Sequence, residues 1–400
     1  MVHRDARSGF TLIELLVVIA IIAILAVVVV LTLNPAELLR QSRDAGRVSD
    51  MATLTSAINL YSVDQSSASS YTLGVSTTVY VSLPDSSSTS CADLGLPTLP
   101  AGYSYSCGSS TSSRNVNASG WLPINFQNIS AGSPLGALPV DTTNNSSSWL
   151  YYTYTTAGGK YQITAHLESQ KYLTSEPASG GADPLLYTAG TNPSLAPFAG
   201  GMIAWWPLNE GSGITAYDDS GFGHNGTMYS NATPTAFWTT SGCKLSSCPN
   251  FSGASLYFVS TSYQNVVSTS NIFTWTVWEY VGTGTGNTVV VLGNRFGSSW
   301  MKITPTAWEV SGGIIAETIP KNQWNQVVIV KNGGNYSYYL NGGLVGTAAG
   351  PTTNATFPFY MGYDPNYGVD GSLTGQMNNV RIYERALSAT EIQALYNAGE

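Results

Sequence analysis

The sequence has 400 residues, more than one typical domain holds, so we expect two or three domains. Only 10% of the residues are charged and 43% are hydrophobic, a composition that supports packed cores and excludes a disordered chain. The formal net charge is −8 and no part of the chain is basic, so there is no nucleic-acid signal of the phosphate-neutralising kind.

The N-terminus has nine polar, slightly basic residues, and an apolar run follows from Phe10 to Leu33, interrupted only by Thr11, Glu14 and Thr32. As a helix this run is about 36 Å long, enough to cross a hydrocarbon core about 30 Å thick. The basic residues ahead of it predict that the N-terminus stays in the cytoplasm and the bulk of the chain lies outside.

A secretory signal peptide and a plain single-pass anchor are the competing interpretations. A signal peptide has a shorter apolar stretch that ends at a small-residue cleavage site, whereas here the small residue, Gly9, precedes the run. Glu14 disfavours both, because a carboxylate inside an apolar helix costs about 3 kcal/mol or more unless it is paired or interfacial. Cleavage between Gly9 and Phe10 would create an amine one turn from Glu14, and packed helices could then pair the carboxylate of one with the amine of the next.

The segment from Gly9 to Ile19 closely resembles the class III signal of type IV prepilins and type II secretion pseudopilins. The resemblance implies cleavage after Gly9 by a prepilin peptidase, N-methylation of Phe10 and Glu14 as the assembly carboxylate. It also implies two kinds of partner, namely other pilin or pseudopilin subunits and an inner-membrane assembly platform. The chain would first be a single-pass protein of the cytoplasmic membrane and later part of a cell-surface filament.

Asn34-Pro35 interrupts the apolar run and predicts a kink or a brief break in a helix that continues to about residue 65. Beyond the break, apolar residues recur at helical spacing, and we interpret most of the charged residues between them as a solvated helix surface. Contact with neighbouring subunits is the functional alternative for these charges, which are Arg40, Arg43, Asp44, Arg47 and Asp50. The expected parts are therefore a leader over 1–9 and a pilin helix over 10–65, of which 10–33 forms the transmembrane or filament core.

Between residues 66 and 175, Ser/Thr-rich turns alternate with short aromatic or apolar runs, and Gly158-Gly159 separates two predicted strands. The resemblance to pilins implies a small antiparallel β head packed on the helix. Asp141 lies in a loop similar to one that binds calcium in some pseudopilins, but further acidic residues are missing, so we interpret it as structural. Residues 176–200 are rich in Pro and Gly, show no period, and are predicted to be a semi-stiff linker.

The four cysteines form two pairs that are close in sequence and lack CxxC spacing, and three pairings are formally possible. If the chain is exported, as the resemblance implies, disulfides Cys91–Cys107 and Cys243–Cys248 are the expected pairing. Four buried free thiols are the alternative.

From residue 201 onward, strand patterns recur about every ten residues and Asn341-Gly342-Gly343 forms a hairpin turn, which indicates a two-sheet sandwich. Only residues 388–397 favour a helix, with Ser388 as N-cap, Glu391 in the capping box and Gly399 beyond its end. The segments 206–210, 219–221, 324–325, 339–342 and 380–388 resemble the laminin-G-like, concanavalin A-like jelly roll of bacterial surface proteins.

This resemblance covers 201–400 and implies a carbohydrate- or protein-binding module. The expected fold class is therefore α+β, with a long N-terminal pilin helix and a small β head, followed by an all-β jelly-roll sandwich. Many such domains hold a structural calcium ion, which takes six to eight oxygen ligands. Asp218, Asp219 and Asn378 are the candidate ligands, and we expect only weak binding because Asn378 and Asn379 stand where the family usually has acids.

Strand periodicity is lost in a late loop that contains Gly and Pro. Its side chains suit a sugar ligand, and loops on rigid sandwiches often provide binding surfaces. A turn with incidental tyrosines is the alternative for these candidate ligand-binding residues, which are Tyr363, Asp364, Asn366, Tyr367 and Asp370.

We expect no enzyme activity. Glycan hydrolases need two carboxylates that face the scissile bond, whereas Glu279, Glu309 and Glu317 are isolated and His166 and His224 are far apart in sequence. The favoured function is a minor or tip pilin-like subunit that displays a lectin-like module to a glycan or protein on an external surface. A pseudopilin of a type II secretion or DNA-uptake machine that contacts cargo is the alternative, and a surface glycan hydrolase is least favoured.

Overall fold

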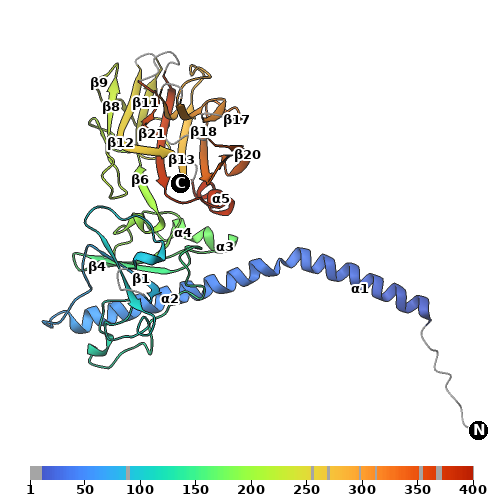
Figure 1. Cartoon of the computed structure of the whole chain (residues 1–400), viewed down its shortest axis with the longest axis vertical. Helices are drawn as coiled ribbons and strands as arrows, with labels where there is room; N and C mark the ends of the chain where they lie inside the picture. Colours follow the sequence, from blue (N-terminus) through green and yellow to red (C-terminus); the bar gives the residue numbers. More distant parts are fainter. Residues whose placement is uncertain are drawn as a thin grey trace, which may run out of the picture.

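The computed structural model describes residues 11–86, 91–253, 256–267, 271–296, 299–310, 313–350, 355–365 and 372–399. A long helical arm leads into a small sheet, and a two-sheet sandwich follows at the far end (Figure 1). This arrangement confirms the predicted α+β class with a C-terminal jelly-roll sandwich.

The arm consists of two helices, α1 (Leu12–Leu33) and α2 (Pro35–Gln65). Between them Asn34 adopts a left-handed backbone with φ of 38°, and its side-chain oxygen accepts a hydrogen bond from the Glu37 amide at 3.4 Å. Pro35 suits the first helical position because it has no amide hydrogen to leave unpaired. The predicted break is therefore confirmed, and the arm bends there (Figure 1).

Among the residues that the structure describes, no helix is both long and apolar enough to cross a membrane.

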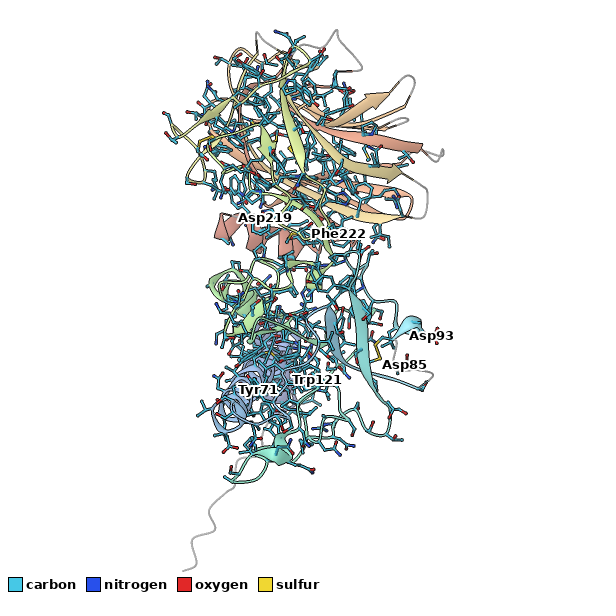
Figure 2. The ribbon with its side chains drawn as sticks, turned by 90° about the vertical axis from the view of Figure 1, so that its left-hand side faces the viewer. Tyr71, Asp85, Asp93, Trp121, Asp219 and Phe222 are labelled. Carbon is cyan, nitrogen blue, oxygen red and sulfur yellow. A yellow bond between two sulfur atoms is a disulfide. The ribbon has the colours of Figure 1, made fainter. Side chains whose placement is uncertain are left out.

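The head is a five-stranded sheet that packs on α2, with Met51, Leu54 and Ile58 of the helix buried against aromatic residues such as Trp121. Figure 2 shows Tyr71 and Trp121 beside α2, seen along its axis. The helices α3 (Gln170–Leu173) and α4 (Ser175–Ala178) follow the fourth strand. In spatial order the strands are β2 (Ser104–Ser109), β1 (Thr78–Asp85), β3 (Tyr152–Ala157), β4 (Lys160–Ala165) and β5 (Tyr187–Gly190).

We predicted an antiparallel head, but β1 and β2 run parallel, so the prediction is wrong for this pair of strands. Parallel neighbours need a long crossover, and the segment between these strands provides one, tied to β2 by the disulfide Cys91–Cys107. The predicted turn at Gly158-Gly159 does join an antiparallel hairpin, β3 and β4, with φ of 58° and 75° at the two glycines.

Arg47 is buried between α2 and the head. Its Nε and Nη2 donate to Asp141 at 2.5 and 3.1 Å, and its Nη1 donates to Asp44 and Glu168, both at 2.6 Å. Arg43 donates to Glu168 from Nε at 2.7 Å. The prediction of a solvated surface is wrong for Asp44 and Arg47, which are 0% and 1% exposed, because this helix face meets carboxylates that come from distant parts of the sequence.

The sandwich consists of an eight-stranded and a nine-stranded sheet. The first has the order β10 (Trp238–Thr239), β11 (Cys248–Ser252), β22 (Thr374–Tyr383), β13 (Ile272–Val281), β18 (Trp324–Asn332), β19 (Asn335–Leu340) and β20 (Gly343–Ala349), with β6 (Met202–Trp206) also paired to β22. The second has the order β17 (Gly313–Ala316), β16 (Ala307–Val310), β15 (Ser299–Thr304), β14 (Leu292–Phe296), β21 (Ala355–Met361), β12 (Tyr257–Val267), β8 (Gly226–Ser230) and β7 (Thr215–Ala216), with β9 (Thr233–Pro234) paired to β8.

The core between these sheets is rich in aromatic side chains, including Trp206, Trp275 and Trp308. The helix α5 (Ala389–Ala398) closes the chain, with the predicted capping box between Ser388 and Glu391. Cys243 and Cys248 form the second disulfide.

Residues 176–200 are folded, so the prediction of a linker is wrong. Within this stretch β5 pairs with β4, and the 3₁₀ turn Pro197–Gly200 is fully buried. Met202 then begins β6, so the chain passes from the head sheet into the sandwich without a tether. The elements in this stretch are about four residues long, too short to show a period in the sequence.

Head and sandwich share a buried junction. Leu185 of the head packs with Tyr383 and Ile392 of the sandwich in one apolar cluster, and the Tyr383 hydroxyl donates to Asp183 at 3.3 Å. Phe222 extends from the lower edge of the sandwich, where Figure 2 also places Asp219, and packs on an apolar cluster of the head. The two parts are therefore in direct contact.

Glu279 lies inside the sandwich, on the side of β13 that also carries Trp275, Val277 and Val281. It is fully buried, and neither carboxylate oxygen has a hydrogen-bond partner among the described residues. Burial raises the pKa of Glu279 to about 8, so the carboxyl is protonated at neutral pH.

We predict that Arg47→Met lowers the free energy of unfolding by about 3–5 kcal/mol, because it leaves buried carboxylates without their cation. Arg40→Met is the matched control. Arg40 is half exposed and lies 3.9 Å from Glu37, so its loss costs less than about 1 kcal/mol. Denaturant unfolding of both variants checks this, and equal stability of the two would contradict the buried network.

We predict that Glu279→Gln removes part of the pH dependence of stability. A carboxyl whose pKa is higher in the folded state makes the protein less stable as pH rises from about 4.5 towards 8. The variant should therefore match the wild type near pH 4.5 and exceed it near pH 8, by an amount on the order of a few kcal/mol. Thermal unfolding at both pH values checks this, and a difference that does not change with pH would contradict it.

Candidate functional site

Glu14 lies in the first turn of α1, where it forms a capping box with Thr11 that the sequence analysis missed. The amide and the hydroxyl of Thr11 both donate to Oε2 of Glu14 at 2.8 Å, and the Glu14 amide donates to Oγ1 of Thr11 at 3.3 Å. The carboxylate is therefore held at the start of the helix. The predicted processing residues Gly9 and Phe10 lie outside the described residues.

The apolar surface of α1 has no cover within the described chain. Its large side chains from Leu12 to Leu25 are all exposed, from 44% at Val18 to 82% at Leu12. Figure 1 shows the helix projecting away from the head. An apolar helix of this kind is stabilised only when other molecules cover it.

The outer face of the nine-stranded sheet carries an aromatic patch, which we define as Tyr229, Phe258, Tyr360 and Tyr363. Tyr229 of β8 and Phe258 of β12 are directly opposite each other and stack with ring centroids 5.0 Å apart. The rings of Tyr360 and Tyr363 each lie 6.0 Å from Phe258. Tyr229 and Tyr360 are both partly exposed.

Strand alternation explains why this patch faces outward. The neighbours Met228, Val259 and Met361 point into the core, and successive side chains of a strand point to opposite faces. Aromatic rings with polar edges on a rigid sheet suit the apolar faces and hydroxyls of a sugar, or a protein surface.

Among its described residues, the predicted ligand loop contributes Tyr363 to this patch. Tyr363 is 6% exposed and Asp364 is 1% exposed, so little of either side chain is open to a ligand. Asn366, Tyr367 and Asp370 lie outside the described residues. The sequence analysis missed Tyr229, Phe258 and Tyr360, although their alternation with core residues along each strand was a usable signal.

Asp218 does not fit the role of a calcium ligand. Its Oδ1 accepts hydrogen bonds from the amides of Trp205 and Ser220, both at 2.9 Å, and its Oδ2 accepts one from the His224 amide at 2.7 Å. These bonds fix the turn after β7 without a cation. The adjacent Asp219 is exposed, and partial desolvation together with the charge of Asp218 raises the pKa of its carboxyl.

Asn378 is equally unsuited to calcium, because its amide donates where an ion would need oxygens. Nδ2 donates to the carbonyls of Pro207, Leu208 and Ser247 at 3.1, 2.8 and 3.0 Å. Oδ1 accepts from the amides of Lys244 and Leu245, which fixes this orientation. The carbonyl cluster is therefore already bound by a neutral donor, and these contacts do not support the prediction of calcium at Asp218, Asp219 and Asn378.

The isolated glutamates remain apart. Glu279 lies inside the sandwich on β13, whereas Glu309 lies on β16 of the other sheet and pairs with Lys302 at 3.5 Å. Glu317 follows β17. Among the described residues, no group of three or more His, Cys, Asp or Glu side chains is arranged to hold a metal ion.

Comparison with known families gives two matches. Residues 4–30 match the prokaryotic N-terminal methylation motif. Residues 253–393 match the concanavalin A-like lectin/glucanases superfamily, in its laminin-G group. No curated protein matches the chain.

Several solved structures are similar to the sandwich at low identity. Domain 4 of an extracellular arabinanase from Geobacillus stearothermophilus, in complex with arabinotriose, is 18% identical, with a TM-score of 0.41, over 50% of this chain and 98% of that one. The binding domain of Paraclostridial Mosquitocidal Protein 1 is 15% identical, with a TM-score of 0.39, over 50% and 52%. A sialidase from Trypanosoma rangeli is 14% identical, with a TM-score of 0.37, over 62% and 44%.

This chain spans about half the length of the second of these proteins and less than half of the third. The likenesses are too distant to assign a ligand or an activity. The two family matches are located where the helical arm and the sandwich lie in the structure. The chain therefore carries a pilin-type N-methylation motif at its N-terminus and a concanavalin A-like, laminin-G-like domain at its C-terminus.

Proposed function

We propose that this protein is a pilin-like filament subunit, in a minor or tip position, that displays its sandwich as an adhesive module for a glycan or protein ligand. A prepilin peptidase cleaves after Gly9, Phe10 is methylated, and residues 10–33 lie in the cytoplasmic membrane as a single pass until an assembly platform transfers them to the filament. We assign the chain no catalytic role.

The exposed helix α1 is the observation that carries this proposal. Its large apolar side chains from Leu12 to Leu25 are uncovered, whereas the head and the sandwich are packed at the other end of the chain. A bilayer can cover such a surface before assembly, and helices of other subunits can cover it afterwards.

The size of the sandwich supports a minor or tip position. Residues 201–400 form a module as large as all that precedes it, and the module sits on the head without a tether. A copy on every subunit would crowd the surface of a fibre. The aromatic patch on its outer face is the surface that we assign to the ligand.

We predict that Glu14→Gln impairs incorporation into filaments while the protein still reaches the membrane. Glutamine keeps the capping box but cannot neutralise the amine of a neighbouring subunit, which would then be buried without a counter-charge. Thr11→Ala is the matched control, because it weakens the cap and keeps the charge. Immunoblots of sheared filaments and membrane fractions check this.

Four outcomes bear on the model of assembly. Normal assembly of the Glu14→Gln variant would contradict the charge pairing, and a mature protein that keeps its first nine residues would contradict the processing. A copy in every subunit along an extended fibre would exclude the minor role, and a chain found only in a secretion machine would favour the pseudopilin alternative.

We predict that Tyr229→Ala and Tyr360→Ala each weaken ligand binding about tenfold, equivalent to about 1.4 kcal/mol, because each removes a ring on which a ligand stacks. Tyr217→Ala is the matched control, since Tyr217 is 55% exposed and lies outside the patch. A glycan array probed with the full chain in detergent identifies the ligand, and titrations with that ligand compare the variants. Undiminished binding by both patch variants would exclude this surface, and silence across all sugars would favour a protein ligand.

A further inference from the structure

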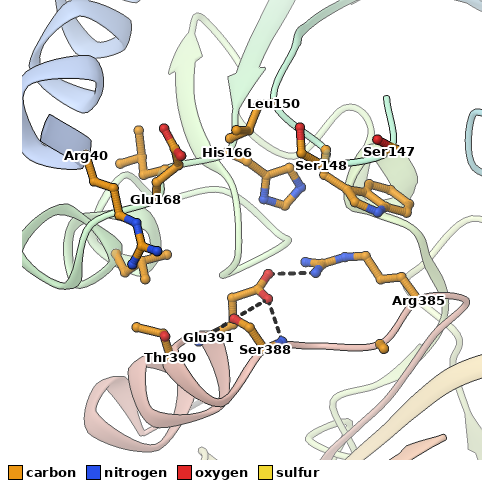
Figure 3. A pocket seen from close by; sticks show the side chains of 14 residues that line it. Arg40, Ser147, Ser148, Leu150, His166, Glu168, Arg385, Ser388, Thr390 and Glu391 are labelled. Atoms are coloured by element: carbon orange, nitrogen blue, oxygen red, sulfur yellow. Dashed lines mark hydrogen bonds and ion pairs between the residues drawn. The ribbon is translucent and has the colours of Figure 1, made fainter. Parts of the chain in front are cut away.

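A pocket of about 380 Å³ lies at the junction of the head and the sandwich. The head contributes Trp149 and His166, α2 contributes Arg40, and the sandwich contributes Arg385 and Thr390. Figure 3 shows Arg40, His166 and Arg385 pointing toward a shared space from three sides. None of the aromatic-patch residues lines it, so it is a separate site.

Two buried polar atoms in this pocket have no partner. Nε2 of His166 and Nη2 of Arg385 make no hydrogen bond with any described residue, although the side chains belong to residues only 8% and 6% exposed. An unsatisfied buried polar group costs about 1–3 kcal/mol, and such groups are usually paired. Both residues line the pocket, so a molecule within it is the available partner.

The rest of the structure fixes the direction of Arg385. Its Nε donates to the Gly200 carbonyl at 2.9 Å and its Nη1 donates to Glu391 at 2.6 Å (Figure 3). Nη2 is then the donor left for a ligand. Burial, together with the charge of Arg385, lowers the pKa of His166 to about 3, so at neutral pH its Nε2 belongs to an uncharged ring that can donate or accept.

Trp149 forms one wall beside these two groups. Its ring lies 6.1 Å from the His166 ring in an edge arrangement and 5.2 Å from the Arg385 guanidinium. Its backbone is left-handed, with φ of 63°, a conformation that costs a residue with a Cβ about 1–3 kcal/mol. The surrounding fold thus holds a strained residue that places an indole at the pocket.

The arginine side chains of the pocket can bind an anionic group. Glu168 is already paired with Arg43 and Arg47, and Glu391 is paired with Arg385. The Arg40 side chain is 50% exposed, and among the described residues its ion pair is with Glu37, at 3.9 Å. Each acid of the pocket is thus bonded to an arginine, although Arg47 is shared with Asp44 and Asp141. The remaining donors of Arg40 and Arg385 suit a carboxylate.

The remaining lining suits a polyhydroxylated molecule. Ser147 and Ser148 place exposed hydroxyls at the pocket. A second cavity of about 370 Å³ adjoins it through Leu173 and Thr390, and its lining includes the amide side chains of Gln170, Gln393 and Asn397. Hydroxyl and amide groups beside an aromatic ring recognise sugars by hydrogen bonds and stacking.

We propose that this junction pocket binds an acidic sugar, with its carboxylate on Arg40 and Arg385, its ring against Trp149 and further sugar units in the adjoining cavity. Because the lining comes from both the head and the sandwich, bound ligand holds the two parts together. The site is independent of the aromatic patch and of any role in filament assembly.

Calorimetric titration of the full chain in detergent with D-glucuronate, D-galacturonate and galacturonate oligomers tests this, with glucose and acetate as reference probes. One site per chain should bind a uronate, and a uronate should raise the midpoint of thermal unfolding. Arg40→Gln and His166→Phe should each weaken binding about tenfold. Phenylalanine keeps the ring contact with Trp149, and Arg40 is half exposed, so neither variant should prevent folding.

Lys171→Gln is the matched control, because it removes a nearby exposed cation that does not line the pocket, and it should change binding less than about twofold. Tighter binding of oligomers than of single uronates would support the role of the adjoining cavity. No uronate binding, equal binding of glucose or acetate, or uronate binding that both pocket variants leave unchanged would overturn the proposal. If the chain binds uronate but fails to assemble or adhere, the result supports the junction pocket as a uronate site. It then counts only against the proposed function.

Discussion

An apolar helix that its own chain cannot cover is the constraint on which the rest of this protein depends. Covering a large apolar side chain contributes about 1.5–3 kcal/mol, and α1 exposes a long series of them. The capping box between Thr11 and Glu14 stabilises the first turn without using any apolar surface. The first turn of the helix is thus capped, whereas its apolar side chains remain uncovered by the described chain.

The remainder of the chain is packed so that the head and the sandwich stay attached to this helix. Arg47 and its three carboxylates fasten the head to α2, and Arg385 with Tyr383 fastens the sandwich to the head. Buried charges of this kind gain little net stability, but they allow few alternative arrangements, because an unpaired charge in the interior costs several kcal/mol. The network at each joint therefore favours one relative position of its two parts.

Local features of the sequence predicted the fold well. The break at Asn34-Pro35, the capping box of α5 and the glycine turn between β3 and β4 each depend on residues that are adjacent in the chain. The family resemblances located the helical arm and the sandwich. The predictions that were wrong concern residues whose partners are distant in the sequence. The burial of Arg47 requires Asp141, and the folded state of 176–200 requires β4 and the sandwich.

The candidate sites also differ in whether they depend on residues that are adjacent or distant in the sequence. Glu14 could be selected from sequence because a lone acid in an apolar run is unusual, whereas the aromatic patch combines β8, β12 and β21, which become neighbours only through sheet register. Asn378 looked like a weak calcium ligand because sequence does not reveal that two backbone amides orient its side chain. The junction pocket likewise exists only once the head and the sandwich have packed together.

The missing tether between β5 and β6 has a geometric consequence. With a flexible spacer, each module would sample many directions and could meet a receptor at any angle. Here the segment between β5 and β6 includes the buried turn Pro197–Gly200, so the direction in which the aromatic patch faces about the long axis of α2 is set during folding. Binding to a receptor on a surface would then depend on the rotation of the fibre about its long axis as it approaches that surface.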